Sequence, residues 1–159
     1  MKSALAFLAV LLLTAATLCR ADAPKKPVHV KQVSVHLFLI PLGVFSDDVT
    51  QMKGFGARNF KPFGSGIPEN QRFDSFLIKV RLESGGEQYV KGRIGTIEVR
   101  SQKSRQIIER QHIRDLYIGP EGETATAMLI RDHVCEPLLV SVRLAQQRIE
   151  QTLSFTCGE

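Results

Sequence analysis

Clusters of metal-ligating side chains are missing from this sequence. Its 159 residues include only three cysteines, four histidines and three methionines, one of which is Met1. None of the four histidines stands at a spacing that is typical of a zinc or copper site. We therefore predict that the protein holds no metal and no cofactor. The histidines are His29, His36, His112 and His133.

Motifs for catalysis are missing as well. The neighbouring carboxylates Asp47 and Asp48 lie in a polar segment, where such residues more often cap a helix or face water. Ser65 stands between Gly64 and Gly66 but lacks the residue pattern of a nucleophile elbow. The sequence thus favours a protein that is not an enzyme.

A strong net charge is absent. The whole chain carries +5, and loss of Lys2 and Arg20 with an N-terminal segment of 21 residues would leave +3 on the remaining 159 − 21 = 138 residues. This net charge makes the chain mildly basic and is smaller than that of a typical nucleic-acid-binding domain. We predict no nucleic-acid partner.

Only one long apolar run is present, from Ala4 to Ala16. It follows the positive charge of Lys2, is too short to span a bilayer, and is followed by small residues. These features predict a secretory signal peptide at residues 1–21, with cleavage after Ala21 and Ala23 as the alternative site. No further membrane-spanning segment is expected, and a mobile, charged leader at 22–27 should precede the folded domain.

The number of cysteines supports export. Cys19 would leave with the signal peptide, so that Cys135 and Cys157 remain as a pair, and paired cysteines in an exported protein usually form a disulfide. A lipid anchor on Cys19 is the less favoured alternative, because Leu18 stands where a lipoprotein has a small residue. The predicted location is the periplasm or the outside of the cell.

Alternation of apolar and polar side chains is the main signal in the rest of the chain. Such alternation places every second side chain on one face of a strand, and turn residues separate the alternating segments. About seven to eight strands of this kind predict an all-β fold, an antiparallel β-sandwich of immunoglobulin or fibronectin type, in a single domain at 28–159. The expected strands cover about 28–40, 73–83, 88–100, 106–118, 124–131, 138–145 and 148–155.

The last two strands form a hairpin in this interpretation. A turn at Gln146 and Gln147 would place Val140 near Leu153, and the hairpin would bring the two cysteines together. A disulfide between Cys135 and Cys157 should then stabilise the domain by about 3 kcal/mol. The alternative is a metal- or thiol-dependent site built from these two cysteines and His133.

Residues 45–72 form the one long segment without a clear period. It carries four glycines and two prolines, allows a short helix near 47–53, and mixes aromatic with basic side chains. Long loops in compact domains are commonly functional. One interpretation is therefore a partner-binding loop; in the other, its phenylalanines pack into an open edge of the sandwich, or the loop covers a pocket for a small solute. The predicted partner-binding residues are Phe55, Arg58, Phe60, Lys61 and Phe63.

Basic residues also accumulate on the strands. Lys79 and Arg81 share one face of a strand, and Arg93 and Arg100 come from a probable neighbouring strand. Together they could form a positive sheet face for an acidic partner. We favour the simpler interpretation that charges on outer strands prevent aggregation.

The sequence thus predicts an exported, non-catalytic binding or accessory module of the cell envelope. It would act through the aromatic and basic loop and through an exposed strand edge, to which a partner can add a strand. The expected partner is another envelope or secreted protein.

Overall fold

The computed structural model describes residues 26–131 and 135–158. The predicted signal peptide (1–21) with Cys19, residues 22–25 of the predicted leader, and His133 lie outside the described residues. The strands are β1 (Val28–Leu39), β2 (Val44–Phe45), β3 (Gly56–Arg58), β4 (Lys61–Phe63), β5 (Phe73–Ser84), β6 (Gln88–Ser101), β7 (Ile107–Ile118), β8 (Glu123–Arg131), β9 (Leu138–Leu144), β10 (Gln147–Leu153) and β11 (Phe155–Thr156).

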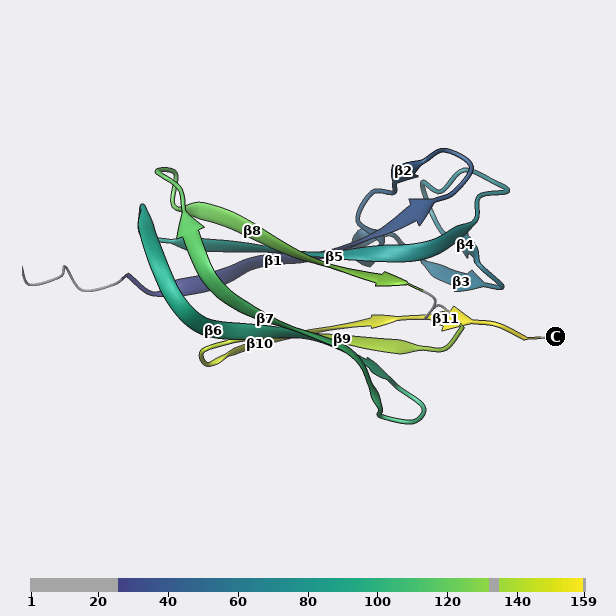
Figure 1. The fold of residues 1–159 in the computed structure, drawn as a ribbon. Helices are drawn as coiled ribbons and strands as arrows, with labels where there is room; N and C mark the ends of the chain where they lie inside the picture. Colours follow the sequence, from purple (N-terminus) through teal and green to yellow (C-terminus); the bar gives the residue numbers. More distant parts are fainter. Residues whose placement is uncertain (1–25, 132–134, 159) are drawn as a thin grey trace, which may run out of the picture.

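Two four-stranded sheets face each other as the layers of a sandwich (Figure 1). Sheet I has the strand order β2-β1-β5-β8 and sheet II the order β10-β9-β6-β7, with antiparallel neighbours throughout. The chain changes sheet between β5 and β6, between β7 and β8, and between β8 and β9. These crossings are the Greek-key connections of immunoglobulin-like sandwiches. The predicted antiparallel β-sandwich of immunoglobulin or fibronectin type is confirmed.

Alternate side chains of the long strands fill the space between the two sheets. Leu37 of β1, Phe76 of β5, Ile97 of β6 and Val142 of β9 are all 0% exposed. Burial of such a side chain contributes about 1.5–3 kcal/mol each. The opposite faces of the same strands carry polar and charged side chains, so each sheet has an outer face that is free for other roles.

The closing hairpin forms with a different register from the predicted one. Val140 pairs with Gln151 and Leu138 with Leu153, so the register prediction was wrong by two residues. The two-residue turn lies one residue earlier than expected, at Ala145 and Gln146, where Ala145 adopts a positive φ of 50°. A shift of two residues keeps every side chain on the same face, so the apolar faces still coincide.

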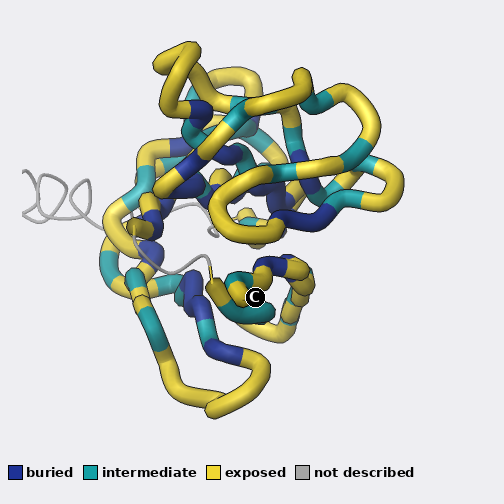
Figure 2. The backbone as a smooth tube through the Cα atoms, turned by 90° about the vertical axis from the view of Figure 1, so that its right-hand side faces the viewer, coloured by how far each residue is buried: buried dark blue, intermediate teal, exposed yellow. Residues whose placement is uncertain are grey.

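The segment predicted as a long loop contains short regular elements. A 3-10 helix at Val49–Gln51 begins after Asp48, whose side chain accepts a hydrogen bond from the Thr50 N–H at 3.1 Å. β3 and β4 form a hairpin, and β11 joins β3 in parallel to complete a small third sheet, β11-β3-β4. Most of the connecting residues at this end of the sandwich are exposed (Figure 2).

Phe155 is the largest side chain that attaches the third sheet to the main core, and Ala57 of β3 is buried in the same core. Phe155 of β11 is 0% exposed, and its ring centroid lies 5.4 Å from those of both Phe73 and Phe76. β11 pairs with β3 while its Phe155 lies in the sandwich core. The β3–β4 hairpin is therefore held against the domain and does not project freely into solvent.

Candidate functional site

The β3–β4 hairpin carries most of the predicted partner-binding residues. Gly56 pairs with Phe63, and Arg58 pairs with Lys61, so these four residues lie on one face of the hairpin. Phe63 is 56% exposed, and Arg58 and Lys61 are exposed as well. The hairpin surface, defined as Arg58, Phe60, Lys61 and Phe63, thus combines two exposed aromatic rings with two basic side chains.

Phe60 occupies an unusual position at the tip of this hairpin. Asn59 and Phe60 are the two turn residues, with φ angles of 49° and 62°. A two-residue turn with both φ angles positive is of type I′, which favours Asn followed by Gly. A bulky side chain is strained in this region of backbone space, and such strain is found most often at functional sites. Phe60 nevertheless stands there and is 41% exposed.

The chain on both sides braces this turn. The Asn59 side chain donates to the Gly158 carbonyl at 3.1 Å and accepts from the Gly158 N–H at 3.0 Å. The Phe60 carbonyl accepts from the Phe73 N–H at 3.1 Å. These contacts stabilise the strained turn and fix the direction in which the tip presents its aromatic side chain.

Phe55 differs from the other four predicted residues. It is partly buried, and its ring meets that of Phe155 edge-on at 6.2 Å. The structure thus places Phe55 against the core, while Phe60 and Phe63 remain accessible. The interpretation that the phenylalanines pack into the sandwich holds for Phe55 and not for Phe60 and Phe63, and the partner-binding interpretation stays a prediction.

The two cysteines form the predicted disulfide. Cys135 and Cys157 lie with their Cα atoms 4.5 Å apart, and the Cys157 N–H donates to the Cys135 carbonyl at 3.3 Å. Their sulfur atoms are bonded to each other, so neither is a thiol in this state. In the described part of the chain, no group of three or more His, Cys, Asp and Glu side chains is arranged to hold a metal ion.

The two edges of sheet I are protected differently. At one edge, the short strand β2 pairs only with the end of β1. Next to it, side chains bond the free backbone of β1: the Val35 N–H donates to the Asp48 carboxylate at 2.9 Å, and the Leu37 N–H donates to the Ser46 hydroxyl at 3.0 Å. β8 forms the other edge and pairs, among the described strands, with β5 alone. Charged residues usually protect such an edge, yet none stands in β8 between Glu123 and Arg131.

An apolar depression lies on the outer face of sheet I beside this edge. Leu129 of β8 is 41% exposed and, with Phe38 and Phe45, forms the apolar part of a depression of about 330 Å³, whose rim is completed by Asp74, Ser75 and Arg131. The rings of Phe38 and Phe45 pack against each other with centroids 5.4 Å apart. An open edge next to an apolar depression is suited to an added strand whose side chains enter the depression.

The outer face of sheet II is rich in arginine. The register pairs Arg143 with Arg148 and Arg93 with Arg114, so like charges stand directly opposite each other at two places. Opposed like charges destabilise a sheet. The arginine face, as we call it, consists of Arg93, Arg100, Arg110, Arg114, Arg143 and Arg148.

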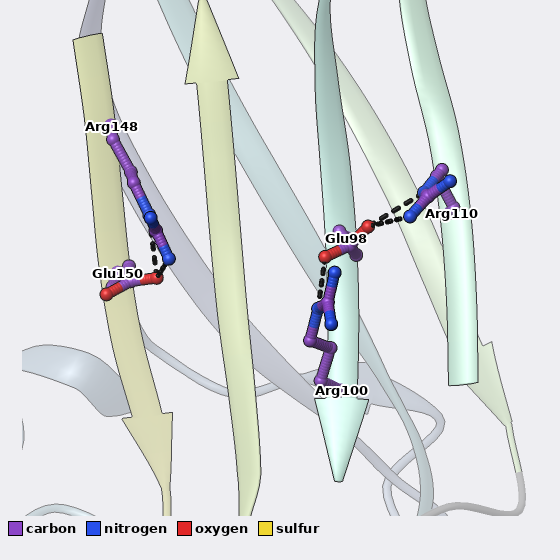
Figure 3. Close-up of polar contacts among 5 residues, drawn as sticks. All are labelled: Glu98, Arg100, Arg110, Arg148 and Glu150. Carbon is purple, nitrogen blue, oxygen red and sulfur yellow. Dashed lines mark hydrogen bonds and ion pairs between the residues drawn. The ribbon is translucent and has the colours of Figure 1, made fainter. Parts of the chain in front are cut away.

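A buried carboxylate lies in the middle of the arginine face. Glu98 of β6 is 7% exposed and meets Arg100 with one oxygen and Arg110 with the other, the latter at 2.7 Å from Nε (Figure 3). Burial alone would raise the pKa of Glu98, but the hydrogen bonds and charges of the two arginines together outweigh burial and lower the pKa. Glu98 therefore stays ionised and holds the two guanidinium groups in place.

A second ion pair lies on β10, between Arg148 and Glu150 (Figure 3). Arg93, Arg114 and Arg143 form no ion pair within residues 26–131 and 135–158. Six arginines against two glutamates give the face a net charge of 6 − 2 = +4 with His112 neutral.

Sequence reasoning found only part of this face. The expectation that Lys79 and Arg81 share a face with Arg93 and Arg100 is wrong, because β5 and β6 belong to different sheets. Arg81 instead pairs with Glu123 at 2.8 Å on the outer face of sheet I. Arg143 and Arg148 were missed, and only the order of the strands could have joined them to β6 and β7.

The sequence matches no protein-family model and no curated protein. Within the residues that the structure describes, no helix is long and apolar enough to cross a membrane. The function must therefore be inferred from the exposed surfaces of this chain.

Proposed function

We propose that this protein is an exported, non-catalytic binding module of the cell envelope that engages another envelope or secreted protein through the hairpin surface. The N-terminal signal peptide predicted from the sequence and the Cys135–Cys157 disulfide support a location in the periplasm or outside the cell. The observation that carries the proposal is Phe60, a large aromatic side chain held exposed in a turn position that favours glycine.

The composition of the hairpin surface fits a protein partner. Aromatic and arginine side chains are enriched in the parts of protein interfaces that contribute most of the binding energy. Phe60 and Phe63 provide the apolar contact, and Arg58 and Lys61 add positive charge beside it. The turn is braced by Asn59, so little conformational entropy should be lost when the partner binds.

The edge of β8 provides a second contact in this proposal. An extended segment of the partner adds to the unprotected edge by backbone hydrogen bonds, and one of its apolar side chains enters the depression beside Leu129. This contact requires no particular sequence in the partner beyond an extended apolar segment. The hairpin surface supplies the selectivity.

Site-directed photocrosslinking in extracts of the source cell envelope tests the hairpin surface. A crosslinking residue in place of Phe63 should give one defined adduct, and Phe60→Ala should abolish it. Tyr89 is also 56% exposed and lies at the start of β6, so a crosslinker there and the variant Tyr89→Ala serve as matched controls. Adducts that form equally at both positions, or that survive Phe60→Ala, would refute the proposal.

A further inference from the structure

We infer that the arginine face of sheet II is a binding site for a linear anionic polysaccharide, independent of the hairpin surface. At the centre of this face, Glu98 of β6 lies opposite Ser141 of the neighbouring strand β9. Arginines surround this pair on all four strands of the sheet.

The arginine face carries like charges in directly opposed pairs. Solubility needs charged side chains, but it does not need like charges directly opposite each other, which cost stability. Arg93 faces Arg114, and Arg143 faces Arg148. A bound anion between such guanidinium groups would remove their repulsion and accept hydrogen bonds from both. Guanidinium groups bind sulfate, phosphate and carboxylate oxygens with two parallel hydrogen bonds.

One buried polar group on this face, the Ser141 hydroxyl, lacks a hydrogen-bond partner among the described residues. Ser141 is 2% exposed, and its hydroxyl makes no hydrogen bond to any described residue. A buried hydroxyl without a partner costs free energy. Ser141 lines both depressions of the arginine face, but its hydroxyl is covered by neighbouring atoms, so a ligand oxygen would supply the missing hydrogen bond once the side chains beside it move apart.

Two depressions hollow the arginine face. One depression of about 460 Å³ includes Arg100, Arg148 and Glu150, and a second of about 250 Å³ includes Arg93 and Arg110. The two share the residues Glu98, Ser141 and Arg143, so they adjoin each other on the outer face of the sheet, and we call them together the groove. Side chains on the same face of a strand are about 7 Å apart. Four positions of β6 point outward along the groove, so the groove extends over roughly 20 Å. These positions are Arg93, Thr96, Glu98 and Arg100. A groove of this length fits a linear chain of several charged units.

The composition of the groove selects the class of ligand. None of the residues that line the two depressions is aromatic, whereas single-stranded nucleic acids bind through bases stacked on aromatic rings. Leu139 is the one large apolar residue among them, whereas protein interfaces have an apolar and aromatic centre. Charge and hydrogen bonding therefore dominate recognition, as expected for a hydrophilic polyanion.

The electrostatics of His112 supports the same conclusion. This residue lies opposite Thr96 in the row next to Glu98. Partial desolvation, followed by the positive charges of Arg93, Arg114 and Arg110, lowers the pKa of His112 below its ordinary value. The face thus has a positive potential that an anion would neutralise.

Binding of a heparin oligosaccharide, used as a sulfated probe, tests the inference by titration calorimetry at about 50 and 200 mM salt. We expect measurable affinity at the lower salt, at least tenfold weaker binding at the higher salt, and at least tenfold weaker binding of the double variant Arg114→Ala/Arg143→Ala. The double variant Lys53→Ala/Lys79→Ala removes the same charge from other surfaces and should bind within twofold of the unchanged protein.

Three comparisons separate the possible results. Polygalacturonate in place of heparin distinguishes carboxylate from sulfate recognition, and binding of either probe through Arg114 and Arg143 supports the site. Equal losses in both double variants would show attraction to net charge only and overturn the inference. Poly-glutamate binding as tightly as heparin, with the same dependence on Arg143, would overturn the assignment to a polysaccharide. Thermal melting of each variant excludes unfolding as the cause.

Discussion

The buried carboxylate of Glu98 accepts a hydrogen bond from Nε of Arg110 at 2.7 Å across the β6–β7 pair. Removal of its charge in Glu98→Gln leaves Arg110 and Arg100 without their ionised partner. We expect a loss of about 1–3 kcal/mol in the free energy of unfolding near neutral pH. Glu150→Gln is the control, because the exposed pair of Glu150 with Arg148 should contribute less than about 1 kcal/mol.

The pH dependence of this loss follows from the lowered pKa of Glu98. Burial opposes the shift, but Arg100 and Arg110 outweigh it, so the carboxyl releases its proton more readily in the native state than in the unfolded chain. The stability that it contributes is fully present above the unfolded pKa of about 4.3 and is lost as the pH falls through the native pKa. Urea unfolding from about pH 3 to 7 should show the difference between the two proteins shrinking at the acid end. A difference that grows towards low pH would contradict this assignment.

Phe60 offers a test in which stability and binding change in opposite directions. Glycine adopts the positive φ of 62° at this position without strain, so Phe60→Gly should leave the free energy of unfolding unchanged or raise it by up to about 1 kcal/mol. The same variant should lose the partner that crosslinks at the hairpin surface. Phe63→Ala is the companion variant: its ring lies over Gly56, so it should lose both binding and about 0.5–1 kcal/mol of stability.

Gly95 is required for the contact between β6 and β9. A Cβ atom at this position would lie 2.5 Å from the backbone carbonyl oxygen of Arg143 and 2.9 Å from a methyl group of Leu144. Because a paired backbone cannot move aside, Gly95→Ala should destabilise the protein by about 2–3 kcal/mol in chemical denaturation. Gly119→Ala is the control, since its Cβ would meet only the Glu123 carbonyl oxygen at 3.8 Å. Similar losses for both variants would refute this explanation.

Alternation was sufficient to find the seven long strands, because each buries one face over many residues. β1 ends at Leu39, one residue before the expected end, and β7 begins at Ile107, one residue after the expected start. β3 and β4 escaped notice because each has three residues, which is too short for a period of two to be recognised.

The candidate surfaces depended on information that lies far apart in the chain. Phe60 and Phe63 stood out as aromatic residues in a polar segment. The positive φ of Phe60, however, belongs to a turn that distant parts of the chain stabilise, namely β11, Gly158 and Phe73. The arginine face could not be predicted without the strand order β10-β9-β6-β7. This order brings Arg148 and Arg114, which are 34 residues apart in the chain (148 − 114), to one face. Local patterns do not determine such an order.

The disulfide connects the stability of the domain to the hairpin surface. It closes a segment with a sequence separation of 22 residues, so its reduction, or the double variant Cys135→Ala/Cys157→Ala, should lower the free energy of unfolding by about 3 kcal/mol. Urea unfolding with and without reductant measures this loss, and the double variant should not respond to reductant. Thiols that react in the native, unreduced protein would contradict the structure.

Reduction should also weaken the hairpin surface before the sandwich unfolds. Cys157 follows β11 directly, and β11 supplies the Thr156 carbonyl that accepts from the Asn59 N–H at 2.9 Å. With the bridge open, this end of the chain is held without a covalent link, by hydrogen bonds to β3 and Asn59 and by the packing of Phe155. We therefore expect hydrogen exchange of the Ala57 and Asn59 amides to accelerate on reduction, while the Ile97 amide in β6 stays protected. Equal acceleration at all three amides would show that the bridge stabilises the domain as a whole and does not act through the third sheet.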